Sequence, residues 1–133
     1  MTPHRRQPMN QAYENQADEF DPELRRGAAL FNAGRYFAAH EAWERIWHGA
    51  AGADRTIVQG LIQAAAAMLH RERGNPRGAE RLWKKARVKL ESAPEIYRGL
   101  AIGELRIALE RCFIWLDRPG ATDEPLPALR LCA

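Results

Sequence analysis

The sequence predicts an all-α protein, a compact bundle of five helices. Apolar residues recur at the three- and four-residue spacing of helices, and glycine or proline separates these segments. No segment shows the alternation of apolar and polar residues that is typical of a half-buried strand. A chain of 133 residues is the size of one domain and needs no metal or disulfide merely to fold. We therefore expect one helical domain.

The first helix is expected over residues 21–32. Asp21 supplies an N-cap, Pro22 occupies the first helical position, and Glu23 places an acid in the first turn. Residues 1–20 are polar and lack a sustained apolar period, so we expect a flexible N-terminal arm.

The other four helices are expected over residues 35–48, 54–73, 75–91 and 102–117. Asp54 is a candidate cap for the third helix, and Asn75 followed by Pro76 starts the fourth. Residues 118–133 are rich in proline and are expected to form an extended tail. The helical domain then spans residues 21–117.

Two helix–helix turns share a pattern in which glycine is followed five residues later by alanine. The pattern begins at Gly34 and again at Gly74, and its alanines are Ala39 and Ala79. It resembles the turn of tetratricopeptide helix pairs, in which glycine frees the backbone and alanine allows close helix approach. We therefore expect helix hairpins that are loosely tetratricopeptide-like, although any helical hairpin uses the same chemistry.

Composition sets limits on location and partners. The net charge of +3 is too small to require a polyanionic partner. Cys112 and Cys132 form neither a CxxC motif nor a disulfide framework, which favours a reducing cytoplasm. The N-terminus lacks the apolar core of a signal peptide, and no apolar run is long enough to span a membrane. We expect a cytoplasmic protein.

The second helix carries a histidine and a glutamate within its most aromatic stripe. On a helical projection His40 and Glu44 lie beside Tyr36, Trp43 and Trp47, which predicts that both face inward. Burial of an isolated charged side chain costs several kcal/mol, so this pair needs hydrogen bonds, an opposite charge or a metal.

The third helix offers partners for that pair. Gln59, Gln63 and His70 share one helix face within an otherwise apolar run. An antiparallel hairpin of the two helices would set His40 and Glu44 against the two glutamines, with His70 farther along. The sequence therefore predicts a polar ligand pocket between the second and third helices.

These residues carry a family resemblance. His40, Glu44 and Trp47 form the motif HxxxExxW, which is followed by the run QGLIQ at residues 59–63 and by His70. This arrangement resembles the domain of unknown function 309 family of bacteria and archaea, and the likeness covers roughly residues 30–116. The resemblance implies that HxxxExxW, and Trp47 with it, belongs to a suspected metal site, with no reaction assigned.

Two functions stay open for the polar cluster. Side chains four residues apart on one helix face can reach a single ion, and His70 is the candidate third ligand for zinc, manganese or ferrous iron. In that case His40 and Glu44 bind a metal or small ligand, and the pair would suit a hydrolytic enzyme. Alternatively, the cluster is a structural network in a non-enzymatic interaction or oligomerisation module.

Two further surfaces bear on partners. One side of the fourth helix is basic, at residues Arg77, Arg81, Lys84 and Lys85. It lacks interleaved aromatic residues and any nucleic-acid motif, so the sequence favours a solvated face over a nucleic-acid partner. The fifth helix carries Ile107 and Ile114 opposite its main apolar stripe, and either the tail or a second copy in a homodimer must cover them.

Overall fold

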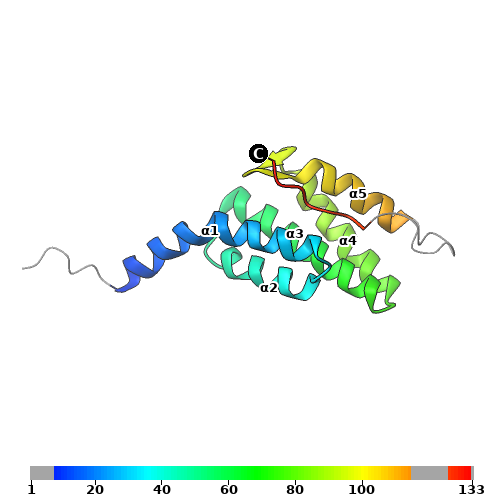
Figure 1. The fold of residues 1–133 in the computed structure, drawn as a ribbon, viewed down its shortest axis with the longest axis horizontal. Coiled ribbons are helices and arrows are strands. Elements are labelled where there is room, and N and C mark those ends of the chain that lie inside the picture. Colours follow the sequence, from blue (N-terminus) through cyan, green and yellow to red (C-terminus); the bar gives the residue numbers. More distant parts are fainter. Residues whose placement is uncertain (1–7, 115–125, 133) are drawn as a thin grey trace, which may run out of the picture.

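Five helices follow one another along the chain, and the computed structural model describes residues 8–114 and 126–132. The helices are α1 (Pro8–Asn32), α2 (Tyr36–Trp47), α3 (Gly52–Glu72), α4 (Pro76–Glu91) and α5 (Ile102–Ile114). Each helix packs on its neighbours in sequence, and Figure 1 shows α3 between the α1–α2 pair and α4. The predicted all-α array of five helices is confirmed.

Local sequence signals set most helix ends where they were expected. Gly34 and Gly74 end α1 and α3 with backbone φ angles of 77° and 73°, a left-handed conformation that favours glycine. Asn75 caps α4, because its side-chain oxygen accepts a hydrogen bond of 3.2 Å from the Gly78 amide. Pro76 occupies the first helical position.

The start predicted for the first helix is wrong. Helix α1 begins at Pro8 and contains Pro22 in its interior, so the cap and proline at Asp21 and Pro22 do not mark a helix end. An interior proline removes one backbone hydrogen bond and its ring crowds the carbonyl four residues earlier, but the glutamine, alanine and glutamate residues before it are good helix formers. The division of the chain into 1–20, 21–117 and 118–133 stays a prediction.

The structure also contains two short strands, which no alternation in the sequence indicated. Strands β1 (Ile96–Tyr97) and β2 (Leu100–Ala101) form an antiparallel hairpin. The two turn residues, Arg98 and Gly99, have φ angles of 49° and 86°, as a tight turn between antiparallel strands requires. A hairpin this short carries too few residues to show strand periodicity.

Residues 126–132 form no helix and run beside the hairpin. Leu131 makes an antiparallel bridge with Leu100, and the Ala101 amide donates to the Arg130 carbonyl at 2.9 Å. Leu129 is fully buried in the core.

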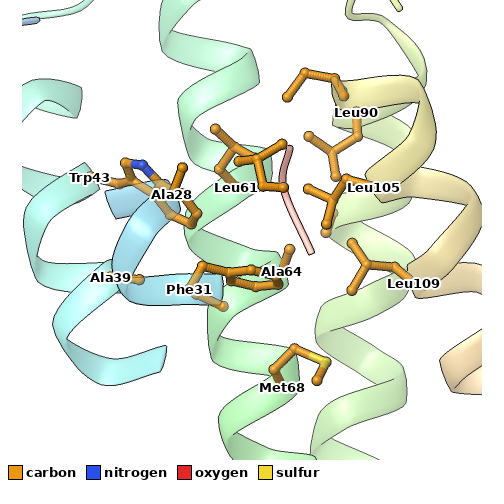
Figure 2. Close-up of a cluster of buried hydrophobic side chains, with 14 of the residues drawn as sticks. Ala28, Phe31, Ala39, Trp43, Leu61, Ala64, Met68, Leu90, Leu105 and Leu109 are labelled. Carbon is orange, nitrogen blue, oxygen red and sulfur yellow. The ribbon is translucent and has the colours of Figure 1, made fainter. Parts of the chain in front are cut away.

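Helix α3 is the centre of the hydrophobic core. In Figure 2 its Leu61, Ala64 and Met68 have Phe31 and Trp43 on one side and the leucines of α4 and α5 on the other. Gly60 brings α3 and α4 close together, because a Cβ atom there would lie 3.0 Å from the side chains of both Lys89 and Leu90. Gly60 therefore favours close approach by α4, and α2, the predicted neighbour, also packs on α3.

Candidate functional site

The buried face of α2 differs from the predicted one. Its buried residues are Tyr36, Ala39, Ala42, Trp43 and Ile46. Their mean direction is rotated about 100° from His40 on a helix of 3.6 residues per turn. The side chains of His40 and Glu44 are 29% and 46% exposed. The prediction that both lie on the buried face is therefore wrong: both lie at its solvent edge.

Small side chains explain this rotation. Ala39 and Ala42 are almost fully buried because a small residue lets neighbouring helices approach closely, whereas Phe37 is 55% exposed. The sequence interpretation gave the aromatic residues more weight than the alanines. No polar or charged residue is buried as a whole within the described parts of the chain.

Single polar atoms of the predicted site are nevertheless buried. Three side-chain atoms in the described residues are shielded from solvent without a hydrogen-bond partner: His40 Nδ1, Trp47 Nε1 and Gln63 Oε1. All three belong to the residues predicted from sequence. His40 Nδ1 lies 3.8 Å from Glu44 Oε2, which is beyond hydrogen-bond distance.

Aromatic contacts hold the side chains of His40 and Trp47, at the two ends of the predicted site on α2. The rings of Phe37 and His40 stack with their centroids 5.9 Å apart. The Arg55 guanidinium lies 3.8 Å from the centroid of the Trp47 ring and donates a hydrogen bond of 3.2 Å to the Trp47 carbonyl. Arg55 thereby joins the start of α3 to the end of α2.

Sequence reasoning missed Arg55 and Phe37 as members of this surface. An arginine in the first turn after a glycine-containing loop can reach the last carbonyl groups of the preceding helix. Arg55 could have been predicted from this position in the sequence. Gln59 is half-buried on α3 and forms no side-chain hydrogen bond with any described residue.

His70 lies elsewhere. Its Nδ1 is 3.0 Å from Asn75 Nδ2, at the turn between α3 and α4. Across the described residues, no group of three or more histidine, cysteine, aspartate or glutamate side chains is arranged to hold a metal ion. The structure therefore does not bring His70 to His40 and Glu44.

Residues 24–82 match the family described as Domain of unknown function (DUF309). This region of the chain is similar to the DUF309 family, and the match covers 59 of the 133 residues. The DUF309 region includes α2 and α3 in full, and with them every residue of the candidate site.

One relative is similar over a larger part of the chain. A protein of Aquifex aeolicus (strain VF5), described as uncharacterized, is 31% identical over 88 residues. The aligned region is 65% of this chain and 26% of that protein, so this chain spans about a quarter of the relative's length.

Among the described residues, no helix combines the length and apolar character needed to cross a membrane.

Proposed function

We propose that this chain binds a small ligand at the edge of the α2–α3 hairpin, through His40, Glu44, Trp47, Gln59 and Gln63. One observation carries the proposal: the three buried polar atoms without a partner in the described chain all belong to this set. A buried polar group without a hydrogen bond costs about 1–3 kcal/mol. A bound molecule that supplies the missing partners removes this cost.

The three atoms indicate the chemistry of the ligand. The indole nitrogen of Trp47 only donates a hydrogen bond, the Gln63 oxygen only accepts one, and the His40 nitrogen does either according to its tautomer. The ligand therefore presents both an acceptor and a donor, as an amide does. Glu44 is exposed beside His40, and an imidazole next to a carboxylate can act as an acid–base pair.

A divalent metal is the second form of the proposal. Atoms 3.8 Å apart on His40 and Glu44 can both lie about 2.1 Å from one ion of zinc, manganese or ferrous iron. Water would supply the other ligands, because His70 lies at the turn between α3 and α4. Elemental analysis of protein purified without chelators or an affinity-tag metal tests this form: metal is expected in the wild type and not in His40→Ala or Glu44→Gln.

The ligand proposal is tested by removing one partnerless atom. Gln63→Met keeps the side-chain volume but removes the amide, so melting of the free protein should rise by about 3–5 °C for each kcal/mol regained. Acetamide, acetate or divalent metal salts should raise the melting temperature of the wild-type protein, and this increase should disappear in Gln63→Met.

Asn32→Leu is the matched control. The Asn32 amide donates to the Leu129 carbonyl at 3.0 Å and accepts from the Leu129 amide at 2.7 Å. Its loss should therefore lower the melting temperature. If Gln63→Met lowers it as much, the Gln63 amide belongs to a structural network and the ligand proposal fails.

As the alternative function, we propose that the chain is an interaction module that forms a homodimer through the exposed side of α5. The side chain of Ile107 is 49% exposed, so the described part of the tail leaves it uncovered. Sedimentation equilibrium should show a dimer that Ile107→Lys dissociates with its helical spectrum intact, whereas a wild-type monomer would contradict this proposal. The free Cys112 and Cys132 suit the cytoplasmic location that we propose.

A further inference from the structure

Helix α4 has one buried apolar side and one exposed basic side. Its buried residues are Gly78, Ala79, Trp83, Ala86 and Leu90. Its exposed basic residues include Arg77, Arg81, Lys84 and Lys85, and together with Glu80 they line an open hollow of about 410 Å³. We call these five side chains the basic hollow.

The positive charge of the chain is concentrated in the segment of sequence that contains this hollow. Residues 71–89 contain eight of the 20 lysines and arginines but only two of the 17 acidic residues. The rest of the chain is net acidic, although the whole chain carries +3. The small net charge therefore conceals a strongly basic segment in a chain that is otherwise acidic.

Most of the basic hollow is not neutralised by the protein itself. Lys84 Nζ pairs with Glu80 Oε1 at 3.2 Å. Within the described residues, Arg77, Arg81 and Lys85 lie in no salt bridge. These three side chains, spaced four residues apart, form an exposed positive strip along α4.

We propose that the basic hollow binds the phosphodiester backbone of a double-stranded nucleic acid. From Arg77 to Lys85 the helix rises about 12 Å, a length that faces about three or four phosphates of one strand. Contacts of this kind require no sequence-reading motif, so the absence of such a motif does not count against them.

The exposed residues of α4 favour a nucleic-acid duplex over other polyanions. A single strand is held by aromatic stacking, but Trp83, the aromatic residue of α4, is buried. A membrane surface takes up the apolar side of an amphipathic helix, and that side of α4 is packed in the core. A duplex backbone requires only the exposed cations.

The test uses the full chain and fluorescence anisotropy with labelled RNA and DNA duplexes over a range of salt concentrations. Wild-type affinity should fall steeply with salt. In the variant Arg77→Gln/Arg81→Gln/Lys85→Gln, the negative slope of log affinity against log salt should become shallower by about 3. Its affinity at low salt should fall at least about tenfold. Glu80→Gln should bind about twofold more tightly because it removes the acid from the hollow.

A matched variant separates this surface from net charge. Arg25→Gln/Arg35→Gln/Arg45→Gln removes the same charge from exposed positions on or beside α1 and α2, and it should retain wild-type affinity. Equal losses in both triple variants, no salt-dependent duplex binding, or binding of poly-L-glutamate in preference to duplex would overturn the proposal. The last result would assign the face to an acidic protein. Circular dichroism checks that each variant is folded.

Discussion

Gly27 lies against the indole ring of Trp43 in the contact between α1 and α2. A Cβ atom at this position would lie 2.1 Å from Trp43 Nε1, far inside contact distance. The ring has little freedom to move, because it is fully buried and its Nε1 donates a hydrogen bond of 3.0 Å to the Leu24 carbonyl. Close approach of the ring to the backbone therefore requires glycine here.

Gly27→Ala should destabilise the protein by about 3 kcal/mol, since overpacking a buried contact outweighs the gain in helix propensity. Urea unfolding measures this change. The control is Gly103→Ala, where the added atom meets only the end of the exposed Glu95 side chain. That variant should be neutral or more stable by up to about 1 kcal/mol. A mild effect of Gly27→Ala would show that the Trp43 ring can move.

At the scale of elements, the β1–β2 turn joins two distant helices. The Tyr97 hydroxyl donates to Asp54 Oδ1 at 2.6 Å, and Arg98 donates to Asp54 Oδ2 at 2.9 Å and to Asp21 Oδ1 at 2.7 Å. Asp54, expected to cap α3, lies in its first turn and binds the hairpin. Burial raises the pKa of Asp54, but hydrogen bonds from Tyr97 and Arg98 outweigh it and lower the pKa overall.

This network predicts a loss of stability in acid. Because the pKa of Asp54 is lower in the folded than in the unfolded state, its contribution is complete above about pH 4 and is lost as the pH falls through the folded-state pKa. Urea unfolding between neutral pH and pH 3 should show a shallower acid loss in Asp54→Asn. Tyr97→Phe should also reduce the acid loss, because without the hydroxyl donor the folded-state pKa of Asp54 lies closer to its unfolded value. An unchanged pH profile in both variants would exclude this role for Asp54.

For the whole molecule, residues 126–132 close the fold by reaching back to α1 and the hairpin. Asn32 at the end of α1 makes both of its side-chain hydrogen bonds to the backbone of Leu129. The Cys132 amide donates to the Gly99 carbonyl at 2.6 Å. Residues nearly a hundred positions apart in sequence thus share one contact.

Leu129→Ala should cost about 2–5 kcal/mol, because it leaves a cavity in the fully buried core. Leu131 is 48% exposed, and Leu131→Ala should change the stability by less than about 1 kcal/mol. Thermal unfolding followed by circular dichroism compares the two variants. Equal effects would mean that the segment is held by its backbone hydrogen bonds alone.

Part of the candidate site was predictable because it depends on helical spacing. His40 and Gln63 were selected by spacing and polarity, and Trp47 through the family resemblance; each of them carries a buried polar atom without a partner. The position of His40 and Glu44 at the solvent edge of α2 was not predictable in this way, because Ala39 and Ala42 help to define the buried face of the helix. The missed Arg55 reaches Trp47 through space, between two helices.

The sequence by itself determined the helical class and the turns at Gly34 and Gly74, because caps, prolines and glycines act within a few residues. Tertiary structure alone decided that Arg98 joins Asp21 to Asp54 and that Leu129 completes the core. These outcomes depend on packing between segments distant in sequence, and its free energy can override a local preference of about 1 kcal/mol.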